Sequence, residues 1–111
     1  MAQCMLLLRG GEFNGYSAEE MQKILENYLA WADKLMQEGK YHGGDELKEG
    51  GRVLSARNGN LVDGPFTETK ETVGGYFLIE ARNLEEAALI ARECPHLTYA
   101  GTVEIREINP H

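Results

Sequence analysis

Residues 4–39, CMLLLRGGEFNGYSAEEMQKILENYLAWADKLMQEG, decide the type of fold. The apolar run at residues 4–8 is typical of a central β-strand that is buried on both faces. Ser17 and Glu20 form a capping box, which marks the start of a helix. From residue 21 to residue 36, apolar side chains recur every three or four positions, as on the buried face of an amphipathic helix. The stretch therefore predicts a buried strand followed by a helix of about five turns.

The remaining residues predict a second helix and further strands. Asn58-Gly59 favours a tight hairpin turn, because both residues adopt positive φ at little cost. Asn83 and Glu86 repeat the capping pattern, and Pro95 cannot continue the helix that they begin. The expected elements are a polar, glycine-rich loop at residues 40–51, strands at 52–57 and 60–63, a strand at 76–81, a helix at 83–94 and a strand at 102–108.

This order of elements, β-α-β-β-α-β with an extra short strand near Asp63, indicates one α+β domain over residues 1–111. It fits a ferredoxin-like sandwich, in which two helices cover one face of an antiparallel sheet. The other face of such a sheet stays open, although strands that contain Leu7 and Leu78 place apolar side chains on it. A second copy packed sheet against sheet is the simplest cover, so we expect a symmetric homodimer.

Composition and charge exclude several classes of protein. The 111 residues carry a formal net charge of −7, which disfavours general binding to nucleic acids because phosphates require a basic face. No apolar run approaches the ~18 residues that span a membrane. The run before Arg9 is too short for a signal peptide, and Cys4 and Cys94 make a poor disulfide framework. We therefore expect a cytoplasmic protein whose two thiols are reduced and buried.

One motif is long and unusual. Asp63-Gly64-Pro65-Phe66-Thr67-Glu68-Thr69-Lys70-Glu71 is followed by Gly74-Gly75-Tyr76. This pattern resembles the signature of the DGPF-type branch of the YCII-related proteins, which are small bacterial proteins. The resemblance runs over essentially the whole chain, through Arg9-Gly10-Gly11, Gly43-Gly44, Cys94-Pro95 and the segment from Gly101 to Arg106. It implies the dimeric α/β barrel, a ferredoxin-like unit paired through its sheets.

The resemblance also implies a range of functions. Relatives in fold include small monooxygenases, isomerases and dehalogenating lyases, which act in a cleft between sheet and helices. The wider group has been proposed to carry a His–Asp pair, and a neighbourhood of extracytoplasmic sigma factors would suit a regulatory or stress-linked role. This chain departs from the pair, because no histidine lies in the first strand or in the DGPF segment.

Asp63, His42 and Glu68 are the candidate catalytic residues. Asp63 either accepts backbone hydrogen bonds in the turn that it starts, or acts as a general base at the mouth of an apolar cleft. His42 is either a surface residue or reaches over the cleft to Asp63. Glu68 either belongs to a solvated loop or acts as acid or base. His96 follows Pro95 and is expected at a rim or a dimer contact.

The candidate ligand-binding residues are Arg9, Phe66, Lys70 and Tyr76. Arg9 ends the first strand and needs an anionic partner, either a carboxylate such as Asp63 or a ligand. Lys70 is either solvated or binds an anionic group of a substrate. Phe66 is either a core anchor or a ligand contact. The histidines have no metal-binding spacing and no cofactor fingerprint is present, so we expect neither a metal nor a cofactor.

Three kinds of function remain open. The first is a cofactor-free isomerase or lyase in which Asp63 acts with His42 or Tyr76. The second is a ligand-binding or regulatory module that uses the same cleft without turnover. The third is a protein-interaction domain that acts through its helix face, with Trp31 and Tyr28 as anchors.

Overall fold

The computed structural model of the chain describes residues 1–64 and 72–111. Glu68, Phe66 and Lys70 lie outside the described residues. The elements, in chain order, are β1 (Ala2–Gly10), α1 (Ala18–Gln37), β2 (Tyr41–Glu46), β3 (Leu54–Arg57), β4 (Asn60–Asp63), β5 (Val73–Ala81), α2 (Leu84–Ala91), the 3-10 helix η1 (Pro95–Tyr99) and β6 (Gly101–Glu107).

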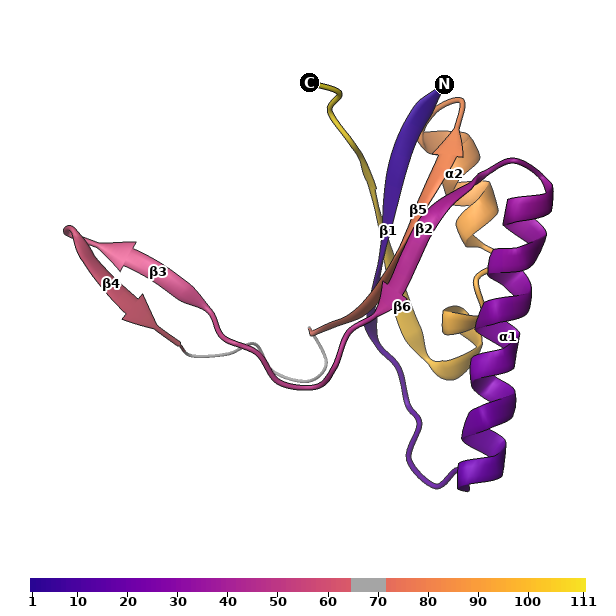
Figure 1. The fold of residues 1–111 in the computed structure, drawn as a ribbon, viewed down its shortest axis with the longest axis horizontal. Coiled ribbons are helices and arrows are strands. Elements are labelled where there is room, and N and C mark those ends of the chain that lie inside the picture. Colours follow the sequence, from indigo (N-terminus) through magenta and orange to yellow (C-terminus); the bar gives the residue numbers. More distant parts are fainter. Residues whose placement is uncertain (65–71) are drawn as a thin grey trace.

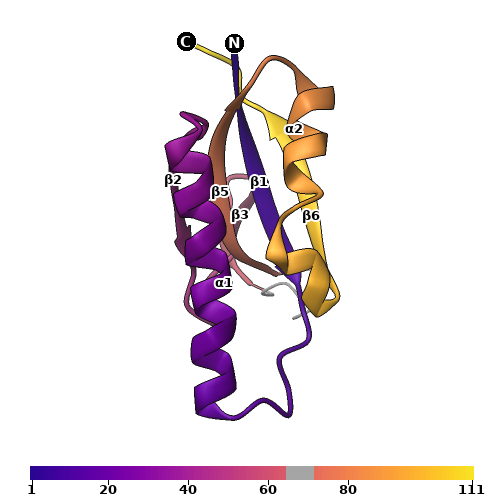
Figure 2. The same cartoon turned by 90° about the vertical axis from the view of Figure 1, so that its right-hand side faces the viewer.

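Four strands form one antiparallel sheet in the order β2-β5-β1-β6. Both helices lie on the same face of this sheet, with α1 beside α2 in a single layer (Figures 1 and 2). The predicted ferredoxin-like α+β sandwich is therefore confirmed. Strands β3 and β4 pair only with each other and form a separate hairpin.

The core lies between the sheet and the helices. Along β1 and β5, buried side chains alternate with partly exposed ones, as expected for strands that have one covered face. Trp31 on α1 is 6% exposed and meets the ring of Phe77 edge-on at 5.1 Å between centroids. The expectation that Trp31 anchors a partner on the helix face is therefore wrong, because its indole completes the core instead.

Both predicted helix starts are confirmed. The Ser17 hydroxyl accepts a hydrogen bond from the Glu20 backbone N–H at 3.1 Å, and the Ser17 N–H donates to the Glu20 carboxylate at 3.0 Å. These hydrogen bonds lower the pKa of Glu20. Asn83 caps α2 by accepting a hydrogen bond from the Glu86 N–H at 2.9 Å, while the Glu86 carboxylate accepts from the backbone N–H of Arg82 at 3.3 Å.

The loop expected at residues 40–51 is wrong in its first half, because Tyr41–Glu46 forms the edge strand β2. The strand expected at 52–57 belongs to the separate hairpin instead of the sheet. Glycine obscures β2 in the sequence, because it is depleted in ordinary strands. Here it is required: a Cβ on Gly44 would lie 2.6 Å from the Tyr76 carbonyl oxygen, and Gly43 adopts a φ of +148° at a shift in register.

The segment between β2 and β5 departs from the sandwich. We call residues 47–64 the arm; it includes β3 and β4 and projects away from the uncovered face of the sheet (Figure 1). The radius of gyration is 15.9 Å. A compact chain of this length would have a radius of about 13 Å. The arm therefore extends well beyond the sandwich.

Replacing Gly44 by alanine tests the close approach of β2 to β5. The added methyl group would press on the Tyr76 carbonyl and on the Phe77 ring, so we expect Gly44→Ala to lower the free energy of unfolding by about 1–3 kcal/mol. Gly74→Ala is the matched control, because its nearest atom lies 4.0 Å away. Urea denaturation measures both variants, and equal stability of the two would contradict the steric explanation.

Candidate functional site

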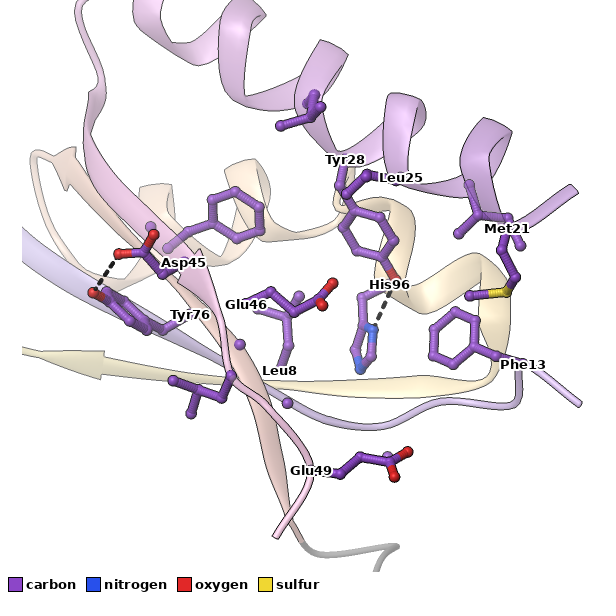
Figure 3. A pocket seen from close by; sticks show the side chains of 18 of the residues that line it. Leu8, Phe13, Met21, Leu25, Tyr28, Asp45, Glu46, Glu49, Tyr76 and His96 are labelled. Atoms are coloured by element: carbon purple, nitrogen blue, oxygen red, sulfur yellow. Dashed lines mark hydrogen bonds between the residues drawn. The ribbon is translucent and has the colours of Figure 1, made fainter. Parts of the chain in front are cut away.

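A cavity of about 540 Å³ opens between α1 and the β2 edge of the sheet (Figure 3). Its wall on the helix side is apolar and comes from Met21, Ile24, Leu25 and Leu29. The sheet contributes Leu8, Gly44, Gly75 and Phe77, and Phe13 closes one end. We call this cavity the cleft. Its size and its apolar lining are those of a site for a small molecule.

His96 is the buried polar group of the cleft, with 4% of its surface exposed. Its Nε2 lies 2.8 Å from the Arg9 carbonyl oxygen and its Nδ1 lies 3.0 Å from the Tyr28 hydroxyl oxygen. A carbonyl oxygen can only accept, so Nε2 must carry a hydrogen. In the neutral ring, Nδ1 is then unprotonated and accepts the hydrogen bond of Tyr28.

Two glycines make room for this imidazole. A Cβ on Gly101 would lie 2.2 Å from the Nε2 atom of His96, and a Cβ on Gly11 would lie 3.0 Å from its Cε1 atom. Gly11 also adopts a φ of +100°, which favours glycine. Because Gly10 pairs with Gly101 across β1 and β6, the ring sits against the end of this pair of strands. The local backbone therefore fixes the position of His96.

Tyr28 supplies the hydroxyl of the pair and comes from the middle of α1. Its side chain is half-buried, and this burial raises the pKa of the hydroxyl, so Tyr28 is a neutral donor at physiological pH. The Tyr28 ring also lies 6.1 Å from the ring of Tyr99, whose hydroxyl accepts a hydrogen bond from Asn27. The oxygen of Tyr28 can still accept a hydrogen bond from a ligand while its hydrogen points at His96.

Carboxylates line the opening of the cleft. Glu46, at the end of β2, and Glu49, at the start of the arm, lie on the side of the cleft, whereas the Asp45 side chain lies on the opposite side of β2 beside Tyr76 (Figure 3). Tyr76 donates a hydrogen bond to Asp45 at 3.2 Å, and this bond raises the pKa of Tyr76. Among the described residues that line the cleft, none is lysine or arginine. The cleft therefore presents a negative rim above an apolar interior.

The residues predicted from the sequence lie at several places. Tyr76 lines the cleft. Arg9 pairs with Glu104 at 3.2 Å on the open face, and the Nε2 atom of His42 lies 3.7 Å from the Glu80 carboxylate. Asp63 ends β4 in the arm, where its carboxylate lies 3.2 Å from Arg52. The expected meeting of His42 with Asp63 is not among these contacts, since each pairs with another residue.

Sequence reasoning missed the roles of His96 and Tyr28. The sequence places His96 at a rim, because it lies outside the regular elements. It places Tyr28 in the apolar stripe of a helix, as an anchor for a partner. The available signal was the position of His96 between a proline that ends a helix and Gly101, which begins the last strand. That signal marks a tightly packed turn, but it does not reveal that residues 9 and 28 meet there.

The described residues show no cluster of three or more histidine, cysteine or acidic side chains arranged to hold a metal ion. Within the same residues, no helix is long and apolar enough to cross a membrane.

The fold and the cleft define a ferredoxin-like α+β protein with a site of small-molecule size. Residues 5–111 match the sequence model of the YCII-related domain, and the chain belongs to this family. It is 28% identical over 100 residues to an uncharacterised protein of Rhizobium meliloti (strain 1021). The alignment covers 86% of this chain and 81% of that protein.

A solved structure with some similarity is the 5-chloro-2-hydroxyhydroquinone dehydrochlorinase TftG of Burkholderia phenoliruptrix AC1100, in complex with 2,5-dihydroxybenzoquinone. The TM-score is 0.49 and the sequence identity is 17%, over 96% of this chain and 95% of that chain.

The hydrogen bonds of His96 predict its tautomer. In the neutral ring, we expect the hydrogen on Nε2 and an unprotonated Nδ1. Two-bond ¹⁵N–¹H correlation spectra report this directly, and Tyr28→Phe should shift the Nδ1 resonance alone. The exposed ring of His111 serves as an internal control that averages over both tautomers. A hydrogen found on Nδ1 of His96 would contradict the geometry.

Proposed function

We propose that the chain binds a small, largely apolar molecule in the cleft, and that this molecule is uncharged or cationic. The observation that carries the proposal is the Tyr28–His96 pair, in which a buried imidazole accepts the hydrogen bond of a half-buried hydroxyl beside the apolar walls of the cleft. Such cavities gain affinity from their apolar walls and specificity from a few placed polar groups. The Tyr28 oxygen would accept a hydrogen bond from an N–H or O–H of the ligand.

The charge of the rim supports the ligand class. Glu46 and Glu49 line the cleft, and a carboxylate or phosphate ligand would meet these charges at close range in a partly desolvated site. A protonated amine would instead gain an ion pair with Glu46, whose side chain lies on the cleft side of β2 (Figure 3). The rim therefore favours neutral molecules and amines over anions.

The same pair supports an acid–base reaction without a cofactor. The Tyr28 oxygen would take a proton from a C–H or O–H of the substrate while the Tyr28 hydrogen passes to Nδ1 of His96. The resulting imidazolium keeps its Nε2 hydrogen bond to the Arg9 carbonyl. Return of the proton to another atom of the substrate completes an isomerisation and restores both side chains. A binding module that uses the same contacts without turnover is the second candidate.

We assign no role inside the cleft to Asp63, His42 or Arg9, because the ion pairs that they form with Arg52, Glu80 and Glu104 lie outside it. We further propose that the chain belongs to the DGPF-type branch of its family, on the strength of the motif that begins at Asp63. Two free, buried cysteines support a reducing compartment such as the cytoplasm.

A ligand series with one variable group tests the function. In a thermal-shift assay, benzylamine and benzyl alcohol should raise the melting temperature, whereas benzoate should not. Tyr28→Phe should weaken binding of the alcohol by roughly tenfold, the equivalent of one hydrogen bond. Glu46→Gln should weaken binding of the amine and spare the alcohol.

Lys34→Gln is the matched control, since Lys34 lies on the same helix but pairs with Glu93 outside the cleft. If Tyr28→Phe and Glu46→Gln behaved like this control, or if benzoate bound best, the proposed ligand class would be wrong. A protein that binds these probes but converts no tested neutral or amine substrate would be a binding module.

We also propose that two copies pair through the open faces of their sheets. Met5, Leu7 and Leu78 are partly exposed and alternate with the buried side chains of β1 and β5, so they lie on the face away from the helices. Charged pairs flank these residues, Arg9–Glu104 on one side and His42–Glu80 on the other. An apolar centre within a polar rim is the ordinary anatomy of a protein interface.

Light scattering during size exclusion tests the homodimer. We expect the unaltered protein to have twice the mass of one chain at micromolar concentration. Leu7→Glu should give a folded monomer, because it would place a charge at the centre of each apposed face. Glu85→Gln, on the first turn of α2, is the control and should remain dimeric. A monomeric parent protein, or a dimeric Leu7→Glu variant, would rule out this mode of pairing.

A further inference from the structure

We propose that the arm of each copy packs against the other copy of the homodimer. We call each of these two symmetry-related contacts a clasp. This inference rests on the homodimer proposed above and adds a second contact surface to it, the hairpin β3–β4. In this arrangement a second copy of this chain covers the apolar side chains of the hairpin.

The direction of the arm is the first support. It leaves the sandwich at the end of β2 and projects on the side away from the helices (Figure 1). A second copy stacked on the open sheet would occupy the same side. Each arm would then run alongside the neighbouring copy instead of into solvent.

The length of the arm is the second support. The longest extent of the molecule is 48 Å, and it runs horizontally in Figure 1. A sheet with one layer of helices is roughly 20 Å deep, so the arm accounts for more than half of this extent. Apposed sheets pack about 10 Å apart. The arm is therefore long enough to pass the sheet of a second copy and to reach its helix layer.

The arm has an apolar face that a single chain leaves uncovered. The register of the hairpin pairs Ala56 with Leu61 and Leu54 with Asp63, which places these side chains on one side. Leu54 is 58% exposed and Leu61 is 73% exposed. A hairpin of two strands is only marginally stable by itself in water. Packing of this face against another surface would supply the stabilisation that the isolated hairpin lacks.

Charge favours a second copy of this chain as that surface. The arm carries three basic residues, Lys48, Arg52 and Arg57, against the acidic residues Glu49 and Asp63. The whole chain has a net charge of −7, so two sandwiches repel each other while a basic arm is attracted to an acidic sandwich. Reciprocal clasps offset part of the repulsion that sheet-to-sheet pairing alone would create.

Photo-crosslinking from the arm tests the proposal. p-Benzoylphenylalanine is placed at Leu61, and a mixture of ¹⁴N- and ¹⁵N-labelled protein is irradiated. We expect a covalent dimer whose crosslinked peptides combine both isotopes, which proves that the bond joins two copies. The same probe at Ser55, on the opposite side of the hairpin, should crosslink several-fold less.

Each other outcome has a definite meaning. Crosslinks within one chain only, or no covalent dimer from a protein that light scattering shows to be dimeric, would overturn the clasp and leave the homodimer intact. A monomeric protein would overturn both. As a second measurement, Leu54→Ser with Leu61→Ser should raise the dimer dissociation constant by roughly tenfold or more, whereas Asn60→Ser should leave it unchanged. Unchanged dissociation in the double variant would count against the clasp.

Discussion

The imidazole of His96 joins three parts of the chain, the end of β1, the middle of α1 and the 3-10 helix η1. Its Nε2–H donates a hydrogen bond to the carbonyl oxygen of Arg9 at the end of β1. Its Nδ1 accepts a hydrogen bond from the hydroxyl of Tyr28 on α1, and its own backbone belongs to η1. A buried polar group without partners would destabilise the fold by about 1–3 kcal/mol. Because both ring nitrogens are satisfied, the same contacts stabilise the end of the sandwich and create a polar point inside the cleft. Structural and chemical roles thus coincide in one side chain.

Most of the fold could be predicted from local signals. The apolar run of β1 and the capping residues Ser17 and Asn83 are short-range signals. The elements that they predict are confirmed by the structure. Strand β2 was not predicted, because its glycines are required by the close approach of the β5 backbone, which is more than 30 residues away in sequence. No local pattern carries that information.

The cleft was harder to predict than the fold. The motif that starts at Asp63 drew attention to the arm and to residues outside the described part of the chain, whereas the polar pair of the cleft comes from α1 and η1. Tyr28 has the spacing of a core residue, and its hydroxyl becomes significant only when His96 faces it. Of the predicted ligand-binding residues, Tyr76 borders the cleft at the pair of strands β2 and β5, and its role in binding stays a prediction. Juxtapositions of this kind depend on tertiary structure.

The position of β1 has a consequence for synthesis of the protein. This strand lies at the centre of the sheet, yet both of its neighbours, β5 and β6, come from the last third of the chain. While the ribosome is still making the first 70 residues, β1 has no strand to pair with, and its apolar side chains and both edges are unprotected. The sandwich can close only when the final strand has emerged. Nascent chains of this topology therefore pass through a long period of exposure, during which a chaperone bound to the first strand and α1 would be most useful.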